Sequence, residues 1–150
     1  MMKVGDKAPD FKLPASGETI VSLKDLKGKK IVLYFYPKDD TSGCTKEACS
    51  FQENRDRFKK KGVVVLGVSA DSVASHEKFA QKYGLDFPLL SDEKREVIKK
   101  YGVWKEKSMY GKKYMGIERT TFVIDEKGVI QHIFAKVKVD GHTHEILGVL

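Results

Sequence analysis

The sequence is short of cysteine, and its apolar runs are brief. Two cysteines among 150 residues are too few for a disulfide-stapled extracellular scaffold. The longest apolar run covers residues 63–68, whereas a membrane-spanning helix needs about 20 such residues. Charged residues stand within the N-terminal segment, where a signal peptide would carry an apolar stretch. We therefore expect a cytoplasmic protein without a membrane partner, in which the cysteines cycle as thiols.

Histidine is also scarce, and its placement does not favour a metal site. Of the four histidines, His142 and His144 are separated by one residue, and His76 and His132 stand alone. Structural zinc sites usually separate paired histidines by roughly three to five residues. The sequence also lacks the glycine-rich patterns that bind nucleotide phosphates. We expect neither a metal nor an organic cofactor.

Basic residues exceed acidic ones, but the excess forms no nucleic-acid-binding pattern. The formal net charge is +7, from 28 basic and 21 acidic residues. Lys59, Lys60 and Lys61 stand together at the end of an expected helix, where they complement its dipole. Acidic residues are interspersed among the other lysines, without a helix-turn-helix or an RNA-binding aromatic pattern. We expect a solvated basic surface and no nucleic-acid partner.

Apolar periodicity along the chain is typical of an α/β fold. Residues 31–36 and 63–69 are apolar runs expected of buried strands, and a helical pattern over 48–58 lies between them. Further elements are predicted as a hairpin over 11–23, helices over 72–83, 93–101 and 141–150, and a second hairpin over 120–134. We expect a single domain over residues 1–150, with an N-terminal β-hairpin and a thioredoxin-like mixed sheet covered by helices on both faces.

Both cysteines lie where the apolar strand at 31–36 gives way to a helical pattern. Cys44 is expected in the first turn of that helix, beside unpaired backbone N–H groups and the positive end of the helix dipole. This environment favours the thiolate over the thiol. The position therefore indicates a reactive sulfur.

The spacing of the two cysteines restricts how they can pair. Positions five apart on a helix lie about 140° apart around its axis, with Cα atoms roughly 8 to 9 Å apart. A disulfide needs Cα atoms within about 7 Å, so joining Cys44 to Cys49 requires the first helical turn to unwind. If both sulfurs are active, oxidation must be accompanied by local unfolding of residues 41–50.

The residues around the cysteines resemble the peroxiredoxin family. Pro37, Thr41 and Cys44 are similar to its Pro-x-x-x-Thr-x-x-Cys signature, and Cys49 to the second cysteine of the PrxQ subfamily, also called bacterioferritin comigratory protein. The resemblance extends to residues 5–11, 32–37 and 117–125. It implies a thioredoxin-like fold and an enzyme that reduces hydrogen peroxide and organic hydroperoxides to water and alcohols.

The resemblance also implies roles for the two sulfur atoms. Cys44 would be the peroxidatic cysteine, whose thiolate attacks the peroxide and becomes a sulfenic acid. Cys49 would be the resolving cysteine, which condenses with it to form an intramolecular disulfide. A thioredoxin-like dithiol protein would then reduce the disulfide. Since the pairing lies within one chain, a dimer is not needed and we expect a monomer.

Three more residues would complete this site by resemblance. Arg119 would place a permanent cation near Cys44 and stabilise both the thiolate and the charge on the departing oxygen. The Thr41 hydroxyl would align the peroxide for in-line attack, and Pro37 would exclude water and fix the start of the loop. Glu47, one turn beyond Cys44, is a further candidate that would orient Arg119.

Taken singly, these residues also have simpler interpretations. Free cysteines are often small buried apolar residues, and Thr41 alone is typical of a helix cap. Pro37 alone would end a strand, and Arg119 alone would be a surface cation. A second functional hypothesis is a non-catalytic thiol redox sensor or binding module, switched by the same disulfide. Repeated turnover of peroxide would distinguish the enzyme from the sensor.

Overall fold

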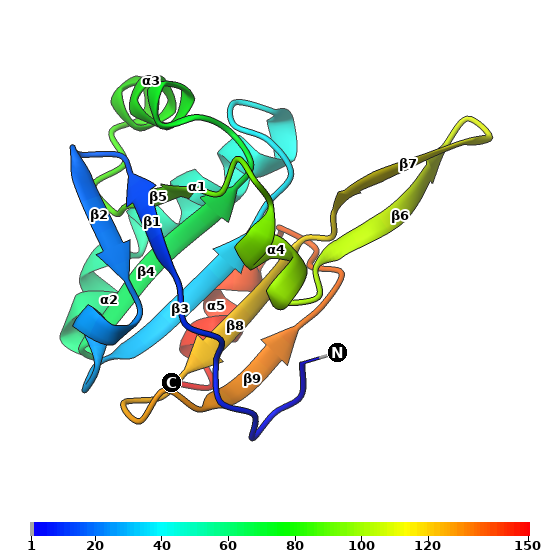
Figure 1. The fold of residues 1–150 in the computed structure, drawn as a ribbon. Coiled ribbons are helices and arrows are strands. Elements are labelled where there is room, and N and C mark those ends of the chain that lie inside the picture. Colours follow the sequence, from blue (N-terminus) through cyan, green and yellow to red (C-terminus); the bar gives the residue numbers. More distant parts are fainter. Residues whose placement is uncertain (1) are drawn as a thin grey trace.

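A computed structural model describes residues 2–150 and shows a seven-stranded mixed sheet with helices on both faces (Figure 1). The strands, in sheet order, are β2 (Thr19–Ser22), β1 (Lys12–Ala15), β5 (Leu89–Ser91), β4 (Val63–Ser69), β3 (Lys30–Phe35), β8 (Thr120–Ile124) and β9 (Ile130–Phe134). Strands β3, β4 and β5 are parallel, and the remaining neighbours are antiparallel. The expected thioredoxin-like sheet and N-terminal hairpin are confirmed.

Strand β3 is buried on both faces of the sheet, as its continuous apolar sequence predicts. Alternate residues enter two separate hydrophobic cores. Leu33 and Phe35 join the core that contains Val97 and Ile98 of α4 (Glu96–Lys100). Val32 and Tyr34 join the opposite core, which is covered by α1 (Ser42–Glu53), α2 (Arg55–Lys60), α3 (Val73–Tyr83) and α5 (His142–Leu147). The strand that leads to Cys44 is therefore held from both sides.

Two helical segments differ from the sequence prediction: one is divided in two, and the other begins later than expected. The pattern over 48–58 is not one helix, because α1 ends at Glu53 and α2 begins at Arg55. Asn54 lies between them, and its side-chain amide donates to the Ser50 carbonyl at 2.8 Å. Helix α4 begins only at Glu96, because Arg95 adopts a left-handed conformation with φ of 62°.

No helix in residues 2–150 is long and apolar enough to cross a membrane.

The structure contains a third hairpin, which the sequence analysis does not predict. Strands β6 (Trp104–Met109) and β7 (Lys112–Ile117) pair with each other as a separate two-stranded sheet and project from the body of the molecule (Figure 1). Tyr110 and Gly111 form the tight turn, both at positive φ, and Tyr110 is 98% exposed. The alternation in this segment is largely among polar residues, so it lacks the apolar periodicity that marks a core strand.

Candidate active site

Sheet pairing brings together two segments that are far apart in the sequence. Phe35, the last residue of β3, lies opposite Thr120, the first residue of β8. The loop that follows β3 and leads into α1 therefore lies beside Arg119, which directly precedes β8. Cys44 is the third residue of α1 and is buried, and the Arg119 guanidinium donates from Nη2 to its Sγ at 3.2 Å.

Glu47 is the second partner of Arg119 and holds its guanidinium at this position. Its Nη1 donates to Oε1 of Glu47 at 2.6 Å. Gly43 allows this close approach, because a Cβ atom there would lie 3.2 Å from Nη2 of Arg119. Burial opposes the charge on Arg119, but Glu47 and Cys44 outweigh it and raise the pKa of the guanidinium. The arrangement directs a permanent cation at the Cys44 sulfur.

Glu47 is almost fully buried, although a glutamate in a helix is ordinarily expected in solvent. Burial raises the pKa of its carboxyl from 4.5 to about 7, although Arg119 acts in the opposite direction. Oε2 of Glu47 and the hydroxyl of Tyr34 are both buried without a hydrogen-bond partner in the described residues. Burial, followed by Glu47 and Cys44, also raises the pKa of Tyr34. A titratable carboxyl therefore lies one turn from the reactive cysteine.

Thr41 and Pro37 line the approach to α1. Thr41 occupies the N-cap position in extended conformation, but its side chain does not cap the helix. Instead its hydroxyl donates to the Lys38 carbonyl at 2.9 Å, which leaves the oxygen lone pairs free to accept. Pro37 follows Tyr36 and is exposed. Their contributions to peroxide alignment and water exclusion stay predictions.

Cys49 lies in the same helix as Cys44 and is partly buried. Burial raises the pKa of its thiol, and the neighbouring Glu53 adds to the increase. Both cysteines are free thiols within α1. That a disulfide between them needs the helix to unwind stays a prediction. The two sulfurs thus differ in environment, since only Cys44 has a guanidinium as a partner.

Lys107 of β6 is a further charged neighbour that the sequence interpretation missed. Its pKa is lowered by burial and by Arg119, whereas Cys44 and Glu118 act in the opposite direction. The aliphatic part of its side chain lies over Gly116 of the paired strand, where an added Cβ atom would come within 3.3 Å of Cδ. The sequence signal for this hairpin is the Tyr110-Gly111 pair at its turn, which would have placed Lys107 on a strand.

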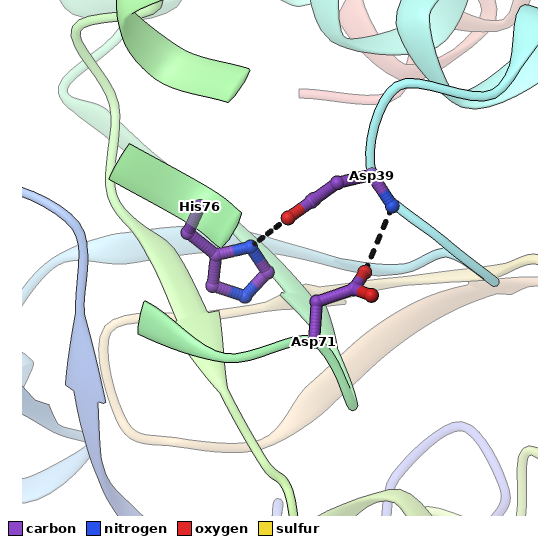
Figure 2. A group of neighbouring side chains, drawn as sticks. All are labelled: Asp39, Asp71 and His76. Atoms are coloured by element: carbon purple, nitrogen blue, oxygen red, sulfur yellow. Dashed lines mark hydrogen bonds and ion pairs between the residues drawn. The ribbon is translucent and has the colours of Figure 1, made fainter. Parts of the chain in front are cut away.

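A separate cluster offers atoms of the kind that bind metals. Asp39, Asp71 and His76 each place a potential ligand atom within 4.8 Å of the others (Figure 2). However, His76 Nδ1 lies 2.6 Å from Oδ2 of Asp39, and Nε2 lies 2.9 Å from the Leu90 carbonyl oxygen. Because both ring nitrogens already have protein partners, a metal would have to displace one of them. The cluster does not fit a ready metal site.

The geometry around Cys44 supports chemistry at sulfur. The Cys44 sulfur is buried at the start of a helix, and the charged Arg119 guanidinium donates to it at 3.2 Å. The same guanidinium can stabilise negative charge that develops on a leaving oxygen. The second thiol in the same helix can then trap the oxidised sulfur.

Comparisons with known proteins agree with this geometry. Residues 4–133 match the family model described as AhpC/TSA family. A bcp protein of Coxiella burnetii is 58% identical over 98% of this chain and 97% of its own length. A PrxQ mutant structure from Xylella fastidiosa has a TM-score of 0.94 and 40% identity, covering 99% of this chain and 95% of that one.

A structure of the bacterioferritin comigratory protein of Xanthomonas campestris, which has alkyl peroxide reduction activity, has a TM-score of 0.91 and 41% identity. It covers 99% of this chain and 94% of that one. The matches extend over nearly the whole chain and include the segments that carry both cysteines and Arg119. The chain therefore belongs to the AhpC/TSA family and, within it, to the thiol-dependent peroxidases of the Bcp/PrxQ peroxiredoxin type.

Proposed function

We propose that Cys44 is the peroxidatic cysteine of this peroxidase and that Cys49 is its resolving cysteine. The contact of 3.2 Å between Arg119 and the Cys44 sulfur carries the assignment, because it gives only one of the two sulfurs a permanent cationic donor. The raised pKa of Cys49 supports the second role, since it leaves less of that sulfur as the thiolate that attacks peroxide.

The proposed reaction is a two-electron transfer from sulfur to peroxide. The Cys44 thiolate attacks the hydrogen-bearing oxygen of ROOH, and the new S–O bond makes Cys44 a sulfenic acid. The O–O bond breaks to release RO⁻, which takes up a proton from solvent and leaves as ROH. Arg119 stabilises the charge on the departing oxygen, and Thr41 accepts a hydrogen bond that aligns the substrate. Cys49 then displaces water from the sulfenic acid, which forms the disulfide.

Peroxides are the substrate class of the family, and a thiol supplies the electrons. We assign both hydrogen peroxide and alkyl hydroperoxides to this chain, the latter because the Xanthomonas campestris relative reduces alkyl peroxides. A thioredoxin-like dithiol is the proposed reductant, attacking the disulfide through a mixed-disulfide intermediate. The single domain over 1–150, the monomeric state and the cytoplasmic location stay predictions.

Intact mass after one equivalent of peroxide tests the assignment. The wild type is expected to lose about 2 Da as the disulfide forms, and Cys44→Ser is expected to show no change. Cys49→Ser should trap a sulfenate that reacts with a sulfenate-specific reagent. A sulfenate formed on Cys49 in the Cys44→Ser protein would reverse the two roles.

The redox-sensor hypothesis uses the same disulfide but predicts different kinetics. A sensor would be oxidised once per reduction and would not need rapid recycling, whereas the peroxidase consumes peroxide repeatedly. Membership of a peroxidase family favours the enzyme. Steady NADPH consumption with thioredoxin, its reductase and peroxide is the expected result, and stoichiometric consumption would favour the sensor.

A further inference from the structure

A buried hydrogen-bonded pair lies beside the loop that leads to Cys44. Asp39 of that loop and His76 of α3 are both buried, and Asp39 Oδ2 lies 2.6 Å from His76 Nδ1 (Figure 2). Oδ2 also accepts from the Ser75 hydroxyl at 2.8 Å, and Oδ1 accepts from the Tyr36 hydroxyl at 2.5 Å. His76 Nε2 lies 2.9 Å from the Leu90 carbonyl oxygen. The pair therefore links the loop to α3 and to β5.

The hydrogen-bond partners determine where the protons lie. A carbonyl oxygen only accepts, so His76 Nε2 must carry a hydrogen. A proton must also lie between Nδ1 and the Asp39 carboxyl, because two acceptors would otherwise face each other at 2.6 Å. With Tyr36 and Ser75 donating to the same carboxyl, every side-chain nitrogen and oxygen atom of Asp39 and His76 has a hydrogen-bond partner. Such networks are rigid because losing one member leaves a buried polar group unpaired.

The backbone of the loop is fixed at the same point. The Asp39 amide donates to Oδ2 of Asp71 at 2.8 Å (Figure 2), and the Ser69 hydroxyl at the end of β4 donates to the same oxygen at 2.7 Å. The next residue, Asp40, accepts from Lys82 of α3 at 2.8 Å. The loop is thus attached to the sheet and to α3 immediately before α1 begins.

Helix α1 is anchored again on the far side of the cysteines. The Ser50 hydroxyl is 2.7 Å from the hydroxyl of Thr143 in α5, and Phe51 is fully buried in the core. Cys44 and Cys49 both lie between this anchor and Asp39. The segment that must unwind for the two sulfurs to meet is therefore bounded at both ends by fixed residues.

We propose that Asp39 and His76 are positioning residues that set the balance between the folded and the unwound forms of the Cys44 segment. The inference rests on the proposed roles of Cys44 and Cys49. In the folded form Cys44 contacts Arg119 and reacts with peroxide, and in the unwound form it meets Cys49. Releasing the loop from His76 removes a contact that holds the folded form. Oxidation of Cys44 then slows, whereas disulfide formation from the sulfenate becomes faster.

Separate measurement of the two steps tests the proposal. Rapid quenching followed by intact mass gives the second-order rate of sulfenate formation in a Cys49→Ser background and the first-order rate of disulfide formation in the full protein. Asp39→Ala is expected to slow the first step by about tenfold, the effect of losing one intramolecular hydrogen bond, and to accelerate the second. A general loss of structure would instead slow both steps.

Two further variants make the test specific. Asp39→Asn keeps an acceptor for Tyr36 and offers an amide donor to Nδ1 of His76, so it should restore most of both rates. Asp86→Ala removes an exposed aspartate that pairs with Arg55 of α2, and it should leave both rates unchanged. If Asp39→Ala does not fold, Ser75→Ala removes one bond to the same carboxylate and should show smaller changes with the same opposite signs.

The possible results separate the proposal from the assigned function. A folded Asp39→Ala or Ser75→Ala protein whose two rates are both unchanged, or both lower, overturns the positioning role while Cys44 and Cys49 keep theirs. A failure of Asp39→Asn to restore the rates also overturns it. A wild-type protein that forms no sulfenate on Cys44 instead refutes the assigned function and, with it, the inference.

Discussion

Replacing Glu47 with glutamine should change how stability depends on pH. The carboxyl has an ordinary pKa of 4.5 when the chain is unfolded and about 7 when it is buried in the native protein. Between these values the native state binds the extra proton, so stability falls as pH rises. At about 1.36 kcal/mol per pH unit, the full interval corresponds to about 3 kcal/mol. Glutamine has no such proton, so Glu47→Gln should not show this loss.

Urea unfolding of the reduced proteins at a series of pH values measures the effect. From about pH 5 to about pH 8, the wild type should lose about 2 to 3 kcal/mol of stability relative to Glu47→Gln. The variant also removes a partner of Arg119, but that guanidinium stays charged across the range and contributes a constant offset. Glu53→Gln removes an exposed carboxylate from the same helix and is the matched control. If the free energies of unfolding of the wild type and Glu47→Gln change with pH in the same way, the raised pKa of Glu47 is refuted.

Three other predictions concern the reactive segment. Arg119→Ala should slow oxidation of Cys44 by about 100-fold, the usual cost of removing a donor to a developing oxyanion, and an unchanged peroxide rate in stopped flow would exclude this role. Cys49→Ser should accumulate sulfinic acid under excess peroxide, which mass spectrometry detects as a gain of about 32 Da, and a chain that stays reduced would contradict it. On oxidation of the wild type, amide hydrogen exchange should accelerate in residues 41–50 but not in β3. If the amides of residues 41–50 stay protected from exchange in the oxidised protein, unwinding is excluded.

The parts of the fold that sequence predicts well are those with a strong local pattern. Strand β3 is recognisable because five of its six residues are apolar and it enters two cores at once. Helix α3 is bounded by a Ser72 side-chain cap and by Gly84 at positive φ, and both are visible as residue types. The break at Asn54 was not predicted, because its neighbours continue the helical periodicity.

The site depends on contacts that sequence spacing does not contain. Cys44 and Arg119 are 75 positions apart and meet only because β8 pairs with β3. Family resemblance supplied this pairing, whereas local reasoning placed Arg119 on the surface. The burial of Glu47 and the bond between Asp39 and His76 were missed for the same reason, since charged residues are ordinarily expected in solvent.

The location of both sulfurs in one helix determines the kinetic order of the cycle. If Cys44 and Cys49 have the proposed roles, each chain carries its own peroxidatic and resolving cysteine. Closing the disulfide is then a unimolecular event whose half-time is the same in a dilute and in a concentrated solution. Only the encounters with peroxide and with the external reductant depend on concentration. Activity per chain should therefore be constant on dilution when both co-substrates are held fixed, even at low copy number.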